Sequence, residues 1–341
     1  MIHSLNTKNT TSTYDVAIIG AGIAGSLCAN LLNNAGYKVC VLEKSRGTGG
    51  RVGSKRRDNK QGCDLGAPYI RAAQTTTQAI LASLEEIGVA SKWSPEPLKT
   101  TKNNAQLYVG NPTMSAITRH WLESIDLISN TRIHYIERLQ NGNETGWLLH
   151  NNQLTKSFFA KYIVIATPAP QAAILLANTL DTKSLLRKTA QAGQTYEAQW
   201  AMWVETDKTP LPSIVEVKNS PLSRLIKDND KPNRDNQYHD VWVLQSTPEW
   251  AQQNLNNDDQ DITNQLLGAF EEHTKLKPKC YGEPHRWLLS RSQAINENTP
   301  YLWHQFQALR LIEDSHSQGD AEGAILSASA LSDHLINELS E

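Results

Sequence analysis

DVAIIGAGIAG, which runs from Asp15 to Gly25, is the stretch that decides the fold. Its first half is a nearly continuous apolar run, which is typical of a central parallel strand that is buried on both faces. Ala and Leu then recur at helical spacing over Ile23–Ala35, and a glycine follows. A second apolar run, Lys38–Glu43, predicts another buried strand. Strand, helix and strand together have the size of a βαβ unit, about 30 residues.

The turn between the first strand and the helix has the pattern GxGxxG, formed by Gly20, Gly22 and Gly25. Gly20 permits the tight turn, Gly22 lets the backbone approach a pyrophosphate, and Gly25 permits close packing of helix on strand. The pyrophosphate is expected on the N–H groups and the positive dipole end of the helix. Glu43, at the end of the second strand, is placed to accept hydrogen bonds from ribose hydroxyls. This combination predicts a dinucleotide-binding α/β fold.

Composition restricts the class of protein further. The 341 residues suggest two domains at about 150 residues each. A formal net charge of −2 argues against a dedicated nucleic-acid binder, and no apolar stretch approaches the roughly 18 residues that a membrane span needs. The four cysteines have neither CxxC pairing nor metal-ligand spacing, so we expect a reduced, cytoplasmic protein without a metal site. They are Cys28, Cys40, Cys63 and Cys280.

Further elements are expected along the chain. Apolar runs predict strands over 132–137, 146–150, 162–166 and 196–204, and a closing helix over 321–340. The segment 219–257 is rich in Asn, Asp, Pro and Lys, which predicts loops around one strand at 240–245. Residues 1–13 are polar and are expected to form a disordered tail.

The segment after the second strand, EKSRGTGGR over Glu43–Arg51, resembles the second signature of the flavoprotein amine oxidase superfamily. In that signature an acid is followed by Arg, a Gly-Gly pair and Arg. A second glycine-rich turn flanked by arginines suits a ligand that extends past the pyrophosphate, because arginine makes charge-assisted bonds to phosphate. The resemblance therefore favours FAD over NAD.

Several segments narrow the resemblance to renalase-like flavoproteins. DLGAPY resembles their DLGAQYF segment, which runs beside the flavin, and ATPAPQ resembles their ATPAPQA turn. YVGNPTMSA, WVLQSTPEW and HRW also have counterparts there, in the same order. In chain order the five segments are DLGAPY at 64–69, YVGNPTMSA at 108–116, ATPAPQ at 166–171, WVLQSTPEW at 242–250 and HRW at 285–287. The resemblance spans nearly the whole chain, from residue 14 to about 338.

The resemblance implies a fold and a reaction. The fold class is α/β, with a Rossmann-like FAD-binding domain of the amine oxidase/p-hydroxybenzoate hydroxylase type and a smaller α+β substrate domain built on an antiparallel sheet. The implied FAD-binding domain is discontinuous, over 14–73, 111–171 and 305–338, and the substrate domain covers 74–110 and 172–304. The implied activity is hydride transfer from a small reduced substrate, such as a dihydronicotinamide isomer, to non-covalently bound FAD. O2 is the implied reoxidant.

The resemblance and the glycine motif together predict the site residues. Trp287 and Arg286, from the HRW segment, are the candidates for substrate contact, and Ile133 is the aliphatic contact to the adenine end. The predicted FAD-binding residues are Gly20, Gly22, Ile23, Ala24, Gly25, Glu43, Lys44, Arg46, Gly50, Arg51, Gly66, Ala67, Pro68, Tyr69, Ile133, Thr167, Asp314, Glu322, Gly323 and Ala324.

The chain departs from the family pattern near its C-terminal flavin motif. Glu313 stands where relatives have Gly, and Asp320 where they have Arg, so negative charge enters a region expected near two phosphates. The helix opening near Gly323 is still expected to aim N–H groups at the flavin. Leu288 and Leu289 replace Arg-Tyr after the HRW segment, which suits an apolar substrate.

Three functions therefore stand open: a renalase-like oxidoreductase, an amine oxidase or biosynthetic desaturase of the same superfamily, and a degenerate flavoprotein that acts as a binding or maturation partner. Nine Trp against four Phe is an unusual ratio. One reading is an aromatic wall over the flavin, and the other is a Trp-rich sheet core. The tryptophans concerned, all placed in the substrate domain, are Trp200, Trp203, Trp242, Trp287 and Trp303.

Overall fold

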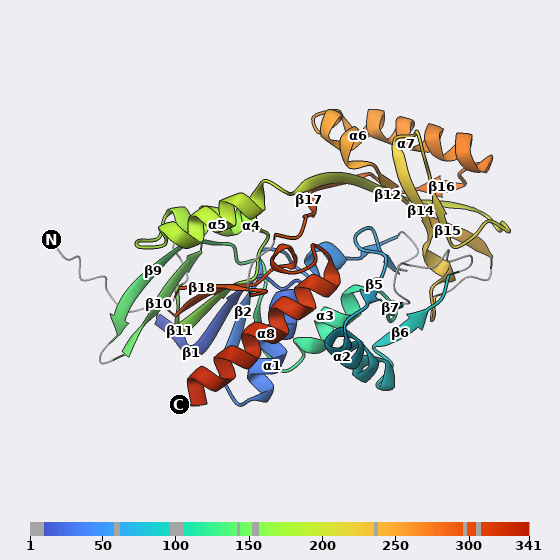
Figure 1. Ribbon diagram of the computed structural model, residues 1–341. Coiled ribbons are helices and arrows are strands. Elements are labelled where there is room, and N and C mark those ends of the chain that lie inside the picture. The colour runs from blue at the N-terminus through green and yellow to red at the C-terminus, as the bar shows by residue number, and fades with distance from the viewer. Residues whose placement is uncertain are drawn as a thin grey trace. The chain divides into compact units, whose positions relative to one another are not determined.

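The computed structural model describes residues 10–57, 62–95, 105–141, 144–151, 157–234, 238–295, 299–304 and 308–340 (Figure 1). The chain forms two compact units, each assembled from separated segments. Unit 1 comprises residues 1–50, 118–195 and 293–341, and unit 2 comprises 51–117 and 196–292. The predicted segments have different limits: 51–73 and 111–117 belong to unit 2, while 172–195 and 293–304 belong to unit 1. In unit 2, strand pairing joins 70–72 to 106–110, and in unit 1 the helices of 172–195 pack on the sheet.

Unit 1 is built on an eight-stranded sheet in the order β18-β19-β11-β1-β2-β8, with β10 and β9 continuing antiparallel from β11. The pairs among β19, β11, β1, β2 and β8 are parallel, as the apolar runs predict for β1 and β2. The predicted disordered tail is wrong for residues 10–13, because the backbone of β1 pairs with β11 from Thr10 onward. Residues 1–9 lie outside the described part. The bounds are β1 Thr10–Ile19, β2 Val39–Leu42, β8 Asp126–Ile128, β9 Ile133–Asn141, β10 Glu144–Asn151, β11 Ser157–Ile165, β18 Leu302–His304 and β19 Leu309–Leu311.

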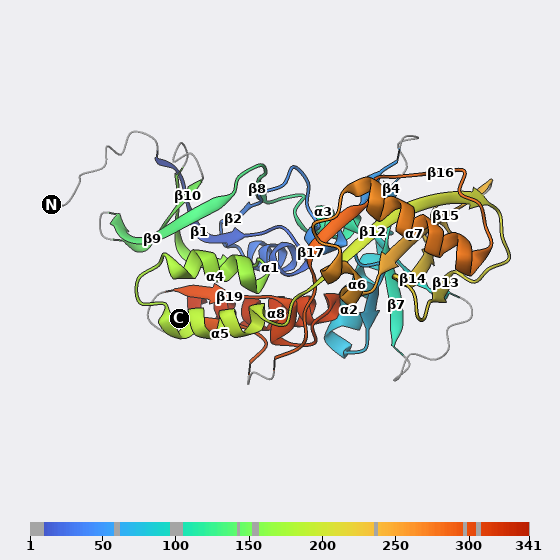
Figure 2. The ribbon, with the colours of Figure 1, turned by 90° about the horizontal axis from the view of Figure 1, so that it is seen from above.

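Helices cover both faces of this sheet (Figure 1). Helices α1 (Ile23–Asn34) and α8 (Ala321–Ser340) lie side by side on one face. Helices α4 (Ala169–Ala177) and α5 (Lys183–Gly193) lie together on the other, where they share a core with Ala17 and Ile19 of β1. Figure 2 shows the pair from above. The parallel strands place the Gly20 turn, Glu43 and Thr167 at one edge of the sheet.

Unit 2 is built on a six-stranded antiparallel sheet in the order β13-β14-β15-β12-β16, with β17 also pairing with β12. Helices α6 (Pro248–Gln253) and α7 (Asp259–Thr274) pack on one face of it. The loop prediction for 219–257 is wrong for β14 and α6, which form because their apolar residues Leu222, Leu225 and Ala251 are buried. The bounds are β12 Glu197–Asp207, β13 Ile214–Glu216, β14 Leu222–Lys227, β15 His239–Ser246, β16 Cys280–Tyr281 and β17 His285–Arg291.

The rest of unit 2 consists of small pieces. Strands β5, β7 and β6 form a three-stranded sheet beside α2, and β3 pairs with β4. The predicted fold class, α/β with a second, antiparallel sheet, is confirmed. The bounds are β3 Lys55–Arg56, β4 Gly62–Cys63, β5 Ile70–Ala72, α2 Thr75–Glu86, β6 Ala90–Trp93, β7 Gln106–Gly110 and, at the junction with unit 1, α3 Ser115–Trp121.

Candidate functional site

The glycine turn after β1 is closed by its own backbone at two of its three glycines. A Cβ on Gly25 would lie 2.0 Å from the Gly20 carbonyl oxygen, and a Cβ on Gly20 would lie 2.7 Å from that of Ala166. Gly20 also has a φ of +110°, which glycine adopts without strain. Gly22 is different, because a Cβ there would meet only the Gly49 carbonyl oxygen, at 4.0 Å. Protein packing therefore requires glycine at 20 and 25, but it leaves the space beside Gly22 open.

A second glycine turn supports the first. The Gly49 N–H donates to the Ala21 carbonyl at 2.8 Å, and Gly22 and Gly49 form an isolated parallel bridge. A Cβ on Gly50 would lie 3.5 Å from the Gly22 Cα. The segment that resembles the second flavoprotein signature thus lies directly against the GxGxxG turn within unit 1.

Glu43 ties these two turns together. One carboxylate oxygen accepts the Ala21 N–H and the other accepts the Ser45 N–H, each at 2.8 Å. The side chain is nearly buried, so these charge-assisted bonds hold both backbones in place. Each carboxylate oxygen has lone pairs beyond the one used here, which leaves acceptor capacity for ribose hydroxyls.

The groups around the open space beside Gly22 fit a phosphate-bearing ligand. Helix α1 begins there with no side-chain cap and no acid in its first turn, and the Glu43 carboxylate lies just before it, on the Ala21 N–H. The buried Thr167 Oγ1 has no hydrogen-bond partner among the described residues, and its methyl group would lie 3.3 Å from a Cβ on Gly20. An unpaired buried hydroxyl is costly unless a ligand or water completes it.

Other residues predicted for unit 1 have varied surroundings. Arg46 is exposed, and Lys44 is exposed with its ammonium 3.3 Å from Gln171 Oε1. Both stand on the segment that joins β2 to the second glycine turn. Ile133 packs into the core of unit 1 with 6% of its surface exposed, and its predicted contact to the adenine end stays a prediction.

Glu313 is turned into the protein, where two hydrogen bonds hold its carboxylate. Its Oε2 accepts the N–H of Ala169, the first residue of α4, at 2.8 Å, and its Oε1 accepts the Ser315 hydroxyl at 2.5 Å. Its carboxylate is nearly buried at the positive end of α4, which stabilises negative charge. The neighbouring Asp314 is buried as well.

Replacing Glu313 with glycine, the residue of the resembled family, should lower the free energy of unfolding by about 1–3 kcal/mol, because the buried Ala169 N–H loses its acceptor. Glu313→Gln keeps an acceptor oxygen and should lose less. Urea denaturation of the three proteins measures the difference. A glycine variant as stable as the parent would contradict this role for Glu313.

The start of α8 differs from the expectation at Gly323. The Gly323 N–H donates to Asp320 Oδ1 at 2.9 Å, so Asp320 caps this helix. The aspartate that replaces the family arginine therefore occupies the Gly323 N–H, and the predicted approach of the other N–H groups of this helix start to the flavin stays a prediction. Glu322 is fully buried and Ala324 is nearly so. Their predicted contacts to FAD remain predictions.

In unit 2, three strands hold the DLGAPY segment. The Trp287 indole N–H donates to the Leu65 carbonyl at 3.1 Å, and the Gln245 amide donates to the Gly66 carbonyl at 2.8 Å. The Arg224 guanidinium donates to the Tyr69 hydroxyl at 3.2 Å. These donors come from β17, β15 and β14, so the segment lies across one face of the antiparallel sheet.

Backbone contacts also hold the DLGAPY segment against Arg51. The Ala67 N–H donates to the Arg51 carbonyl at 2.9 Å, and a Cβ on Gly66 would lie 2.0 Å from that same oxygen. Glycine at 66 is thus required by packing inside unit 2. The Arg51 guanidinium lies over the Tyr196 ring at 5.5 Å, and Pro68 is buried. The predicted flavin contacts of Arg51, Gly66, Ala67 and Pro68 remain predictions.

Asp64 anchors the start of the segment in a buried charge network. Its carboxylate accepts Lys231 Nζ at 2.9 Å, the Arg234 guanidinium at 2.7 Å and the Ser54 hydroxyl at 2.6 Å. Lys231 also donates to Asp228 at 2.6 Å. Burial alone would raise the pKa of Asp64, but Lys231, Arg234 and Ser54 hold it below its ordinary value. The sequence offered no signal for this network.

Arg286 and Trp287, predicted together as substrate contacts, point to opposite faces of the sheet. Arg286 pairs across strands with Trp200, lies over its ring at 5.7 Å and donates to the Leu255 carbonyl. Trp287 pairs with Gln199 and lies on the face that carries the DLGAPY segment. The contacts of Arg286 therefore give no support to a substrate role. Leu288 is 55% exposed.

The tryptophans do not form one aromatic wall. Trp200 and Trp242 belong to the core between the sheet of unit 2 and its helices, with Phe270 6.3 Å from Trp242. Trp303 lies on β18 in unit 1, so its placement in the substrate domain is wrong. Among the described hydrogen bonds of these five tryptophans, only that of Trp287 reaches the DLGAPY segment.

His285 packs edge-on against Trp287, with ring centroids 4.5 Å apart. Burial and the nearby Lys55 charge lower the pKa of His285 to about 4. The folded protein therefore binds fewer protons here than the unfolded chain, in which histidine titrates near pH 6.5. The stabilisation is complete above about pH 6.5 and is lost as the pH falls toward 4. His285→Gln should flatten the stability profile in that window, as urea titrations at several pH values would measure, whereas the exposed His273→Gln should not.

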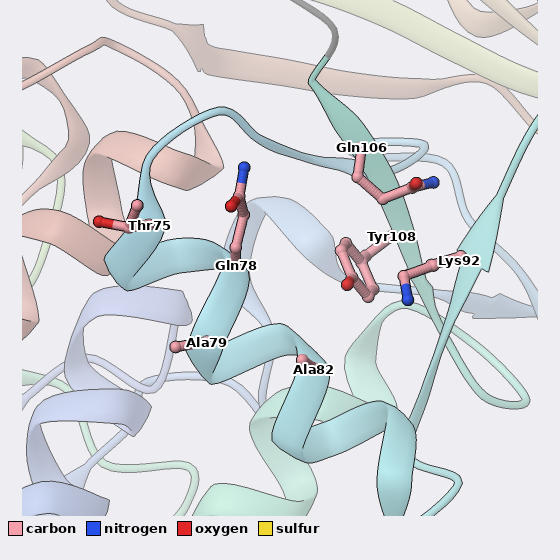
Figure 3. A pocket seen from close by; sticks show the side chains of 7 residues that line it. All are labelled: Thr75, Gln78, Ala79, Ala82, Lys92, Gln106 and Tyr108. Carbon is pink, nitrogen blue, oxygen red and sulfur yellow. The ribbon is translucent and has the colours of Figure 1, made fainter.

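A groove of about 520 Å³ lies elsewhere in unit 2, between α2 and the β5-β7-β6 sheet (Figure 3). The side chains of Gln78, Lys92 and Tyr108 line it, and Lys92 forms an ion pair with Glu85 at 2.9 Å. It contains none of the predicted site residues. Within the described ranges, no cluster of three or more His, Cys, Asp or Glu could hold a metal ion. No helix in those ranges is both long and apolar enough to cross a membrane.

Comparison with known proteins places this geometry in context. A family model described as an NAD(P)-binding Rossmann-like domain matches residues 18–84. The chain is 37% identical over 78 residues to flavin-containing amine oxidase B of Cavia porcellus, which is 23% of this chain and 14% of that protein. It is 39% identical over 66 residues to the L-amino-acid oxidase of Mus musculus, 19% and 10% of the two chains. These matches therefore span only a small part of the relatives' length.

Solved structures cover far more of the chain. Cyclohexylamine oxidase from Brevibacterium oxydans IH-35A superimposes with a TM-score of 0.70 at 13% identity, covering 96% of this chain and 100% of that one. Putrescine oxidase superimposes with a TM-score of 0.68 at 12% identity and the same coverage. The chain has the fold of these oxidases.

Proposed function

We propose that the chain is an oxidoreductase that binds FAD non-covalently and oxidises a small reduced substrate, with O2 as the reoxidant. The observation that carries the proposal is the open space at Gly22, which lies beside the uncapped start of α1 and within a turn that packing otherwise fills. A glycine that the protein does not need for its own packing is explained by a ligand that approaches the backbone there.

Residues of unit 1 would hold the cofactor. The N–H groups at the start of α1 would bind the pyrophosphate, Glu43 would accept from the ribose, and the unpaired Thr167 hydroxyl would gain a partner. Lys44 and Arg46 add positive charge beside it. When bound, FAD supplies the hydride acceptor, and the protein supplies orientation and exclusion of water.

Flavin content tests this proposal directly. Purified protein, or protein reconstituted with FAD, should show the visible absorption of flavin, and acid precipitation should release the flavin into solution because no covalent bond holds it. A colourless protein that cannot be reconstituted overturns the proposal and favours the degenerate binding partner. Glu313 and Asp320 motivate that alternative, and in the structure both carboxylates accept backbone N–H groups.

For the substrate class, we propose a renalase-like oxidation of dihydronicotinamide isomers, supported by the resemblance of five ordered segments. Amine oxidation is the second candidate, supported by the fold shared with putrescine and cyclohexylamine oxidases. An anaerobic screen separates the two. Bleaching of the flavin by the dihydronicotinamide isomers, with none by amines, supports the first. Bleaching by amines alone overturns it.

A further inference from the structure

Three hydrogen-bonded side chains lie side by side on β11, β10 and β9 of unit 1: Ser157, His150 and Glu137. Ser157 and His150 are directly paired across their strands, and Ser157 Oγ lies 3.0 Å from His150 Nδ1. Glu137 Oε1 lies 3.0 Å from the other ring nitrogen, His150 Nε2. A hydroxyl bound to a base that is itself bound to a carboxylate is the arrangement that activates a serine nucleophile. These three residues are called the triad below.

The carboxylate of Glu137 determines where the protons of the triad lie. An ionised carboxylate only accepts hydrogen bonds, so in the neutral imidazole the proton must be on Nε2. Nδ1 then carries the lone pair, and the Ser157 hydroxyl donates to it. The ring of Tyr135 stacks beside the imidazole, with 5.7 Å between ring centroids and 26° between planes. The histidine is therefore held in the tautomer that can take a proton from the serine.

The triad lies on the face of these strands that is turned away from the core. Its sequence neighbours are buried in the core of unit 1: Ile136, Leu149 and Phe158. Side chains alternate between the two faces of a strand, so the triad points to the opposite face. Glu137 and Ser157 are partly exposed there, beside the partly exposed Leu148 and the exposed Tyr135. This face therefore offers apolar surface next to the hydroxyl, and it is partly open to solvent.

A β-bulge in β9 lies next to the histidine. His150 pairs with Tyr135, but the following residue of β10 pairs with Ile133, so His134 is the extra residue of the bulge. A bulge bends its strand and changes the direction of nearby side chains, and bulges recur next to active sites. The triad is thus held by three paired strands, which position side chains more precisely than loops do.

We propose that Ser157 is a nucleophile for acyl transfer from small esters, with His150 as its general base and Glu137 as the residue that positions the base. Ser157 Oγ bonds to the ester carbonyl carbon while its proton passes to His150 Nδ1. That proton then goes to the alcohol oxygen that leaves as the ester C–O bond breaks. A water molecule attacks the acyl serine in the same way and releases the acid. This activity is separate from the proposed oxidation and uses no flavin.

Labelling of the full-length protein with an alkyl fluorophosphonate tests the nucleophile, because the bond from Ser157 Oγ to phosphorus forms as fluoride leaves. Peptide mapping should place the adduct on Ser157. His150→Gln should slow labelling at least about 100-fold, the effect of losing a general base. Glu137→Gln should slow it at least about tenfold, because an amide can donate to Nε2 and favour the other tautomer. Glu137→Asp keeps a carboxylate and should restore part of the rate.

Ser184→Ala is the matched control, since Ser184 is an exposed serine of α5 in the same unit, and it should be labelled like the parent. Nitrophenolate release from nitrophenyl acetate should fall at least about tenfold in Ser157→Ala and stay unchanged in Ser184→Ala. Urea denaturation of each variant separates a slower reaction from a lost fold. A parent protein without an adduct, an adduct on another residue, or unchanged nitrophenolate release in Ser157→Ala overturns the proposal.

Discussion

Replacing Gly22 with alanine should remove the cofactor while leaving the fold intact. The new Cβ would meet no protein atom closer than 4.0 Å, and Gly22 has an ordinary φ of −79°, so the apo protein should keep its stability within about 0.5 kcal/mol. The methyl group would fill the space that the pyrophosphate needs. We expect FAD binding to weaken at least about 100-fold, equivalent to about 2.7 kcal/mol, as titration of the apo protein with FAD would measure.

Gly25→Ala provides the contrast, because its Cβ would lie 2.0 Å from a backbone oxygen and 3.0 Å from the Ala166 Cβ. Backbone must move, so this variant should lose about 1–3 kcal/mol of stability as well as its cofactor. Gly268→Ala in α7, where a Cβ meets nothing within 4 Å, should instead stabilise by up to about 1 kcal/mol. FAD binding of parental strength in Gly22→Ala would refute the assignment of this turn.

The largest effect on stability is expected from Lys231→Met. The side chains of Lys231 and Asp64 are fully buried, and the change leaves Asp228 without its described ion-pair partner. Removing one member of a buried pair costs about 3–5 kcal/mol, because the remaining charge stays uncompensated. Urea denaturation should show this loss. Asp228 and Asp64 hold the pKa of Lys231 above its ordinary value against the effect of burial, so its contribution persists up to about pH 10.

Lys277→Met is the control for that experiment. Lys277 pairs with Glu271 on the surface, where its side chain is 85% exposed. Exposed pairs contribute about 0–1 kcal/mol, so this variant should unfold almost like the parent. Equal, small losses in both lysine variants would show that the buried network does not stabilise unit 2.

The periodicity of the sequence was sufficient to predict those helices and strands whose own residues carry a clear apolar pattern. The apolar runs of β1, β2 and β11 and the pattern of α8 predicted these elements because each is buried on at least one whole face. Strand β14 and helix α6 were missed because their polar positions dominate the composition of 219–257, although Leu222 and Ala251 are fully buried. Packing against the sheet, which no local pattern records, determines both.

The candidate site likewise has some features that local sequence predicts and others that only the fold brings together. The glycine turn and Glu43 follow from local spacing, since both turns that Glu43 holds lie within 24 residues of it. The cap formed by Asp320 had a local signal as well, an aspartate just before an apolar helical run, but the family comparison drew attention to the lost arginine instead. Asp64, Lys231 and Arg234 come together only through the fold of unit 2, so no spacing along the chain could pair them.

The division of unit 1 among three separated segments has a consequence for synthesis on the ribosome. Its central strand β11 pairs with β1 on one side and with β19 on the other, and α8 packs against α1. A nascent chain that ends before residue 293 contains every segment of unit 2 but lacks the last strands and the closing helix of unit 1. Unit 2 can therefore fold first. Until the last residues emerge, the apolar surfaces of α1 and of the unit 1 sheet that α8 and β19 cover stay exposed to water. Exposed apolar surface makes this interval the one in which we expect aggregation to compete with folding.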